Sequence, residues 1–300
     1  MIEAIAVSKS FDDIKAIDSV TASIKEGSVY GLVGTNGAGK STFLRMVCGI
    51  YKPDRGNVIV DNSEVYENES IKKQIFYISD DQFFFSNATP DDMKKYYQVM
   101  YDTFDGERFD KLIKQFELNP KRKINTFSKG MKKQVSIICG LCATTKYLLC
   151  DETFDGLDPV MRQAVKSILI GEIMERNMTP IIASHSLREL EDICEHVGLL
   201  HKGGILFSRD LDDMKLNIHK LQCVFASEES EKQVLSQLQV MHYDKKGSIC
   251  YLTVRGELDQ ISQCMESVNP VFYESVQLSL EEIFISETEV LGYDIKKLIF

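Results

Sequence analysis

The chain has 300 residues, 44% of them hydrophobic and 27% charged, which is the composition of an ordinary globular protein. Its net charge of −10 argues against a nucleic-acid partner, since the densest basic run, Lys121-Arg122-Lys123, is short. The first residues lack the pattern of a signal peptide, and no apolar run approaches the roughly 18 residues of a membrane span. We therefore expect a cytosolic protein with reduced cysteines.

In chain order, apolar runs and turn residues predict alternating strands and helices over the first two thirds of the sequence. This alternation indicates a mainly parallel sheet with helices on its faces. A helical block interrupts it, and we expect a helical lobe at about residues 82–140. The expected strands are 5–7, 16–24, 29–33, 58–60, 75–78, 147–150 and 180–183, and the expected helices are 40–48, 91–116 and one from about Ser128. Cys139 and Cys142 lie in this helical context without a second cysteine pair, which favours core packing over a zinc or redox site.

The pattern changes after Phe207. Six segments between 221 and 276 follow the order strand, helix, strand, strand, helix, strand, which is typical of the ferredoxin-like split unit. Lys245-Lys246-Gly247 suits a hairpin turn between the middle strands. We predict a large α/β domain at 1–209, a linker at 210–220 and a small α+β accessory or regulatory domain at 221–300.

A glycine-rich segment at residues 34–41 lies between an expected strand and an expected helix. Its spacing matches the phosphate-binding loop of P-loop nucleotide triphosphatases. Glycines allow the backbone N–H groups to converge on phosphate oxygens at a helix N-terminus. Lys40 is expected to reach the β- and γ-phosphates of ATP, Ser41 to ligate Mg²⁺, and Thr42 to add a phosphate contact. The whole segment is Gly34, Thr35, Asn36, Gly37, Ala38, Gly39, Lys40 and Ser41.

Two adjacent carboxylates end the apolar strand at 147–150. Such a pair is costly unless it meets a cation or lies in a cleft. We expect Asp151 to hold Mg²⁺ and Glu152 to orient or deprotonate the attacking water. With the phosphate-binding loop, these residues predict a nucleotide triphosphatase.

The loop Phe127-Ser128-Lys129-Gly130-Met131, with Ser128 23 residues before Asp151, resembles the Leu-Ser-Gly-Gly-Gln signature of the ABC ATPases. Further segments, in a shared order over residues 1–207, also resemble this family. Gly156-Leu157-Asp158 resembles its D-loop, and His185 stands 33 residues beyond Glu152, at the place of its switch histidine. Phe11 occupies the place of the aromatic residue that stacks on adenine.

The resemblance implies the P-loop ABC ATPase fold, with antiparallel N-terminal strands beside the parallel core. It also implies two ATPase subunits head to tail, with ATP held between Lys40 of one and Ser128 and Gly130 of the other. Asp80 stands where the family has a glutamine that helps to coordinate Mg²⁺, and Gln82 nearby is an alternative for that role. Lys129, Met131 and Thr153 also depart from the family pattern.

The Ser-Lys-Gly-Met form of the signature and the tail at 278–284 resemble ATPases of exporters whose permease is a separate chain, including exporters of antimicrobial or amphipathic peptides. The resemblance thus implies a homo- or heterodimeric ATPase at the cytoplasmic face of the membrane, bound to an integral-membrane permease. The triplet Phe83-Phe84-Phe85 either receives a permease helix or packs inside the helical lobe. The alternatives are a soluble ABC ATPase and a regulatory ATP-binding protein, neither coupled to transport.

Overall fold

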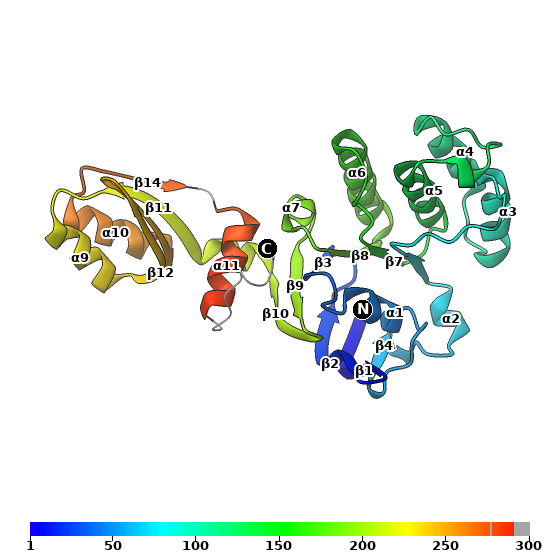
Figure 1. The fold of residues 1–300 in the computed structure, drawn as a ribbon, viewed down its shortest axis with the longest axis horizontal. Helices are drawn as coiled ribbons and strands as arrows, with labels where there is room; N and C mark the ends of the chain where they lie inside the picture. The colour runs from blue at the N-terminus through cyan, green and yellow to red at the C-terminus, as the bar shows by residue number, and fades with distance from the viewer. Residues whose placement is uncertain (277, 291–300) are drawn as a thin grey trace. The chain divides into compact units, whose positions relative to one another are not determined.

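The computed structural model describes residues 1–276 and 278–290, leaving aside the side chains of 215, 216 and 286–290. It divides into two compact units, Met1–Ser208 and Arg209–Phe300, shown in Figure 1. Residues 291–300 of the expected C-terminal domain lie outside the described part. Among the described residues, no helix combines the length and the apolar character that a bilayer crossing requires.

A six-stranded sheet forms the centre of the first unit. β3 pairs in parallel with β8 and β9, and β7 pairs in parallel with β6 and β8. β3, β7 and β8 are buried along their whole length, as strands covered on both faces must be. This confirms the mainly parallel core. The order across the sheet is β10 (Gly204–Asp210), β9 (His196–His201), β3 (Tyr30–Val33), β8 (Thr179–Ser184), β7 (Tyr147–Asp151) and β6 (Ile75–Ile78).

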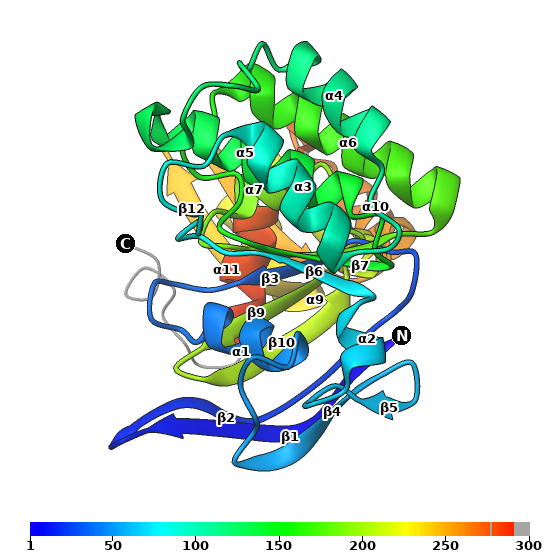
Figure 2. The same ribbon diagram turned by 90° about the vertical axis from the view of Figure 1, so that its right-hand side faces the viewer.

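A second, antiparallel sheet is built from the N-terminal strands, as expected. Its order is β2 (Ile14–Ile24), β1 (Ile2–Phe11), β4 (Arg55–Val60) and β5 (Ser63–Glu64). Helix α1 (Lys40–Val47) lies between the two sheets in Figure 2. Its side chains Phe43, Leu44, Met46 and Val47 are fully buried and join both sheets in one core cluster. This packing holds the start of α1 against the end of β3.

Helices α3 (Pro90–Met100), α4 (Gly106–Gln115) and α5 (Lys129–Cys142) form the expected helical lobe, with the short turn η1 (Ile124–Thr126) before α5. The helical pattern at 91–116 is divided, because Tyr101 is extended and Asp105 begins a new helix by accepting a hydrogen bond from the Arg108 amide at 2.8 Å. Figure 2 shows this lobe and α6 (Pro159–Arg176) on one side of the six-stranded sheet. Two short helices, α2 (Glu69–Lys72) and α7 (Leu187–Leu190), complete the unit.

The second unit contains an antiparallel sheet in the order β12-β13-β11-β14. Gly247, with φ of 65°, makes the turn between β12 and β13. Leu221, Cys223, Leu252 and Val254 of the sheet pack against side chains of both helices. This is the ferredoxin-like order, which confirms that prediction. The elements are β11 (Ile218–Val224), α9 (Glu228–Gln237), β12 (Gln239–Lys246), β13 (Ile249–Arg255), α10 (Leu258–Val268) and β14 (Phe272–Val276), followed by α11 (Leu280–Val290).

The segment 210–220, expected as a linker, is structured. Helix α8 (Leu211–Leu216) begins after Asp210, whose side chain accepts hydrogen bonds from two amides of the first turn. Leu211 and Met214 are buried, and β11 begins at Ile218. Helix α8 has only six residues, which is too short for apolar periodicity to identify a helix in the sequence.

Candidate nucleotide site

The glycine-rich loop joins the end of β3 to the start of α1. Gly37 and Gly39 have φ angles of 81° and 108°, which disfavour any residue with a side chain. A Cβ on Gly39 would also lie 2.4 Å from the carbonyl oxygen of Ala16. The N-terminus of α1 therefore opens onto a loop whose backbone can approach a ligand closely, the arrangement that binds phosphate groups.

Lys40, the first residue of α1, folds back over this loop. Its Nζ donates to the carbonyl oxygens of Gly34 at 2.6 Å and Thr35 at 3.2 Å. The side chain is 5% exposed, and its ammonium also lies 3.1 Å from Oε1 of Glu152. The loop lysine and the carboxylate after β7 therefore meet at one point.

Asp151 ends β7 with its carboxylate buried. Oδ1 accepts a hydrogen bond from the hydroxyl of Ser41 at 3.0 Å, and Oδ2 accepts one from the hydroxyl of Tyr77 at 2.8 Å. Burial raises the pKa of Asp151, against the opposing effect of the two hydrogen bonds. A divalent cation would favour the ionised form, and hydroxyl and carboxylate oxygens are ligands that Mg²⁺ accepts. The donor set at Ser41 and Asp151 thus fits the expected metal.

Glu152 and His185 lie together after β7 and β8. Nδ1 of His185 lies 2.8 Å from Oε2 of Glu152, and the amide of His185 donates to the same oxygen at 3.3 Å. Glu152 has φ of 48°, and its own amide donates to the carbonyl of Ala183 at 3.0 Å. Because β7 and β8 are parallel neighbours, their carboxyl ends deliver both side chains to one edge of the sheet.

Asp80 lies just after β6 and pairs with Lys133 of α5, with 3.3 Å between Oδ1 and Nζ. Lys133 is fully buried and also donates to the carbonyl oxygen of Glu152. The side-chain amide of Gln82 donates to the carbonyl of Asp80 at 2.6 Å, within its own loop. The sequence alone did not identify Lys133 or Tyr77. Lys133 could have been identified from its position on the same helix face as the apolar positions Ile137 and Gly140, which are buried.

The signature-like loop lies at the start of α5. Ser128 caps this helix by accepting from the Met131 amide at 3.2 Å, and both Ser128 and Lys129 are exposed. Lys129 pairs with Asp155 at 3.0 Å, and a Cβ on Gly130 would lie 3.1 Å from the carbonyl of Gly156. The signature-like and D-loop-like segments of one chain are therefore neighbours. Asp158 caps α6, accepting from the Met161 amide at 2.9 Å.

Phe11, at the end of β1, is 39% exposed. Its ring meets that of Tyr51 edge to face, with 5.2 Å between the centroids. The guanidinium of Arg45 in α1 lies 5.9 Å from the centre of the Tyr51 ring. Phe11 thus presents an open aromatic surface that is connected to α1 through one neighbour.

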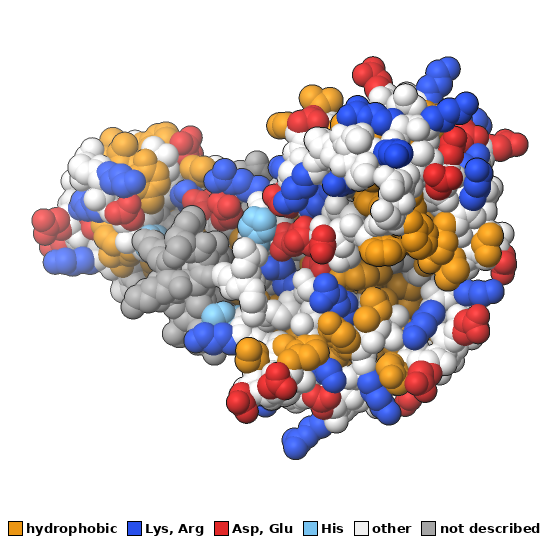
Figure 3. Space-filling model, turned by 45° about the vertical axis from the view of Figure 1, so that its right-hand side comes forward, with side chains coloured by type: hydrophobic (Ala, Val, Ile, Leu, Met, Phe, Trp, Pro, Cys, Tyr) orange, Lys and Arg blue, Asp and Glu red, His pale blue; other side chains and the backbone are white. Residues whose placement is uncertain are grey.

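Exposed aromatic side chains mark the helical lobe. Phe83 is 74% exposed and Phe85 44%, and Phe85 meets Tyr96 of α3 edge to face at 4.9 Å. A cavity of about 200 Å³ lies beside them, lined by Phe84, Phe85, Ile124 and polar neighbours. The space-filling view in Figure 3 shows hydrophobic side chains gathered on the first unit between charged ones. We name Phe83, Phe85, Tyr96, Val99 and Met100 the lobe patch, and these side chains are all exposed.

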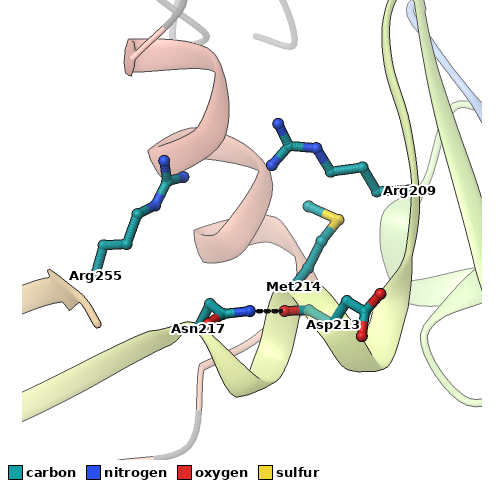
Figure 4. A pocket seen from close by; sticks show the side chains of 5 residues that line it. All are labelled: Arg209, Asp213, Met214, Asn217 and Arg255. Atoms are coloured by element: carbon teal, nitrogen blue, oxygen red, sulfur yellow. Dashed lines mark hydrogen bonds between the residues drawn. The ribbon is translucent and has the colours of Figure 1, made fainter. Parts of the chain in front are cut away.

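A separate cavity of about 270 Å³ lies in the second unit. Figure 4 shows its lining side chains, among them Arg209, Met214 and Arg255, and the side-chain amide of Asn217 donates to the Asp213 carbonyl at 2.8 Å. It shares no residue with the nucleotide site.

The cysteines at 139 and 142 are buried, and burial raises the pKa of both thiols, that of Cys142 to about 12.

Known proteins resemble this chain in sequence and in fold. A family model described as ABC transporter matches residues 17–155. The chain is 27% identical to the ABC transporter ATP-binding protein YtrB of Bacillus subtilis (strain 168), over 96% of this chain and 98% of that protein. It is 30% identical to the lantibiotic transport ATP-binding protein SrtF of Streptococcus pyogenes, over 68% of this chain and 88% of that protein. A solved structure of an ATP-binding subunit of an ABC transporter superimposes with a TM-score of 0.66 at 24% identity, over 72% of this chain and 92% of that one.

Proposed function

This chain belongs to the ABC transporter family as an ATP-binding subunit, and we propose that it hydrolyses ATP between two ATPase subunits to drive a separate membrane permease. One observation carries the assignment of the site: Lys40, Asp151, Glu152 and His185 converge where three neighbouring parallel strands end. Ligands of open α/β sheets bind at this edge, beyond the carboxyl ends of the strands.

Within this site, the residues divide the work of phosphoryl transfer. Residues 34–42 hold the phosphates, with Lys40 at the β- and γ-phosphates. Ser41 and Asp151 would hold Mg²⁺, which supplies charge neutralisation at the phosphate oxygens when it is bound. Glu152 orients or deprotonates the attacking water, and His185 holds Glu152 and contacts the γ-phosphate. Phe11 offers its ring to the adenine.

A second ATPase subunit completes the site. Ser128 and Gly130 come from the start of α5, where Ser128 and Lys129 are exposed and available to the phosphates of a facing copy. Asp158, at the start of α6, would line the same interface. ATP then joins the two subunits, and hydrolysis releases them.

We further propose that the lobe patch receives the permease, which would place the subunit at the cytoplasmic face of the membrane. An exposed apolar patch of this kind on a charged protein marks an interaction surface. The similarity to a lantibiotic transport protein supports an exporter of peptides or antibiotics. Replacing Phe83 with Asp should reduce co-purification with the permease, whereas Met174→Asp on α6, where Met174 is 82% exposed, should not.

The experiment that tests the ATPase assignment replaces Glu152 with Gln. The variant should bind ATP but lose turnover by about 10²–10⁴-fold, because an amide cannot act as the base. It should also accumulate as an ATP-bound dimer, measured by sedimentation with Mg²⁺ and ATP. Lys40→Met is the matched control, since it should neither bind ATP tightly nor dimerise.

Two outcomes would contradict this proposal. Turnover at the wild-type rate in Glu152→Gln would remove Glu152 from the reaction. A wild-type protein that binds ATP, with its permease present, but releases no phosphate would instead be a regulator that uses ATP as a ligand.

A further inference from the structure

Lys133 is a buried cation that the expected chemistry does not use. The residue is 0% exposed. A lysine is almost never fully buried unless it is paired. Removing an ammonium group from water is costly unless charges and hydrogen bonds replace its hydration. The described hydrogen-bonding partners of Lys133 are the Asp80 carboxylate, at 3.3 Å, and the carbonyl oxygen of Glu152, and its charge also helps to lower the pKa of Asp155. Both belong to segments beside the nucleotide site.

The contact with Glu152 bears on how that side chain is aimed. Glu152 has φ of 48°, in the left-handed region that residues other than glycine rarely adopt. Its amide donates to the Ala183 carbonyl of β8, and its carbonyl accepts from Lys133 of α5 and from the Asp155 amide, at 3.3 Å. Such a conformation persists only where its surroundings enforce it. These hydrogen bonds fix both peptide groups around the Glu152 Cα and so direct its carboxylate toward Lys40 and His185.

Lys133 also lies one turn along α5 from the signature-like loop. Ser128 caps this helix, and Lys133 in its second turn contacts Asp80 after β6 and Glu152 after β7. A movement of α5 would therefore shift both the loop that meets the second subunit and the hydrogen bond that holds Glu152.

Asp80 gains a different role from the one its position suggested. Its carboxylate lies 3.3 Å from the buried ammonium of Lys133, and its side chain is 52% exposed. Asp80 therefore provides a negative charge at the solvent-facing side of the buried lysine. Gln82, the alternative residue, donates to the backbone of its own loop.

We propose that Lys133 is a positioning residue for hydrolysis, which holds the Glu152 peptide in place, and that Asp80 is its counter-ion and not a ligand of Mg²⁺. This role rests on the proposed hydrolysis of ATP at Glu152. It gives a physical reason for an acid at Asp80 in this chain, since the buried amine of Lys133 requires an anion and a neutral glutamine would not supply one.

Turnover and nucleotide binding of the full chain test the positioning role. Lys133→Met keeps the length of the side chain but removes the side-chain donor to the Glu152 carbonyl, which keeps only the Asp155 amide of its own turn. We expect phosphate release to fall by about 10-fold or more, with ATP affinity within about threefold of the wild type, because the phosphate loop is untouched. Lys133→Arg should restore most of the rate. The matched control is Lys166→Met, which removes another buried lysine, 4% exposed and paired with Asp192 at 3.4 Å, without touching Glu152.

A double variant separates positioning from stability. Asp80→Leu should lower the melting temperature by several degrees, since it leaves the Lys133 ammonium without its hydrogen-bonded anion. Adding Lys133→Met should recover most of that loss, because the cation is gone, yet turnover should stay as low as in Lys133→Met alone. The Mg²⁺ concentration for half-maximal turnover should be unchanged in Asp80→Ala and in Gln82→Ala.

The outcomes are distinguishable. Wild-type turnover in Lys133→Met, with Glu152→Gln inactive, would overturn the positioning role and leave the ATPase assignment intact. Normal turnover in Glu152→Gln would contradict the proposed function itself. A tenfold higher Mg²⁺ requirement in Asp80→Ala would overturn the counter-ion role. If the isolated subunit turns over too slowly to measure, a double variant that melts no higher than Asp80→Leu would overturn the pairing itself.

Discussion

Nδ1 of His185 lies 2.8 Å from Oε2 of Glu152, so the histidine after β8 holds the carboxylate after β7. His185→Ala removes this contact and should lower phosphate release by about 10²-fold or more, while ATP binding changes little. Turnover and nucleotide affinity measured side by side check this. His242→Ala, an exposed histidine of the second unit, is the control and should behave as the wild type. Equal rates in the two variants would show that His185 is dispensable.

Tyr77 supports the carboxylate proposed to bind the metal. Its hydroxyl donates to Oδ2 of Asp151 at 2.8 Å, opposite the hydrogen bond from Ser41. Tyr77→Phe should raise the Mg²⁺ concentration for half-maximal turnover by about 10-fold, as loss of a partner to a metal ligand commonly does. Tyr101→Phe removes a hydroxyl bonded to the Ile75 carbonyl of the same strand and should leave the Mg²⁺ dependence unchanged. An unchanged Mg²⁺ dependence in Tyr77→Phe would contradict the role of this hydrogen bond.

The two compact units suggest that nucleotide binding resides in the first alone. A fragment of residues 1–210 keeps β10 (Gly204–Asp210) whole and contains every residue of the proposed site. We expect it to melt cooperatively and to bind ATP within about threefold of the full chain, because the first unit packs around a hydrophobic core of its own. Calorimetry with ATP would measure both. A fragment that folds but binds no ATP would assign the second unit a part in the site.

Asp61 lies at the centre of a partly buried polar cluster on the first unit and should make stability depend on pH. Burial alone would raise its pKa, but hydrogen bonds from Lys146, the N-terminal amine and Tyr147 lower it from 3.8 to about 2. The folded pKa lies below the unfolded value, so the stabilisation is present above pH of about 4 and is lost as the pH falls toward about 2. Asp61→Asn should cost about 2 kcal/mol at pH 7, a difference that shrinks below pH of about 4. Urea unfolding at several pH values would measure it, and a pH-independent difference would contradict the linkage.

The sequence by itself determined the parts of the site that are contiguous in the chain. Residues 34–41 carry their own phosphate-binding geometry, because glycine spacing and a following helix are local properties. The pair Asp151 and Glu152 was identifiable because an apolar strand ending in two acids is also local. The strand and helix order of the second unit indicated its ferredoxin-like sheet for the same reason.

Only the tertiary structure decided which distant residues serve these groups. Tyr77 and Asp151 meet because β6 and β7 are parallel neighbours, and Lys133 reaches Asp80 and Glu152 because α5 packs over the ends of those strands. The position of Asp80 in the sequence suggested that this residue replaces a metal-binding glutamine. That position gave no indication that the buried amine of Lys133 lies beside Asp80. A side chain's partner depends on packing between elements far apart in the chain, whereas periodicity and spacing report only the element to which it belongs.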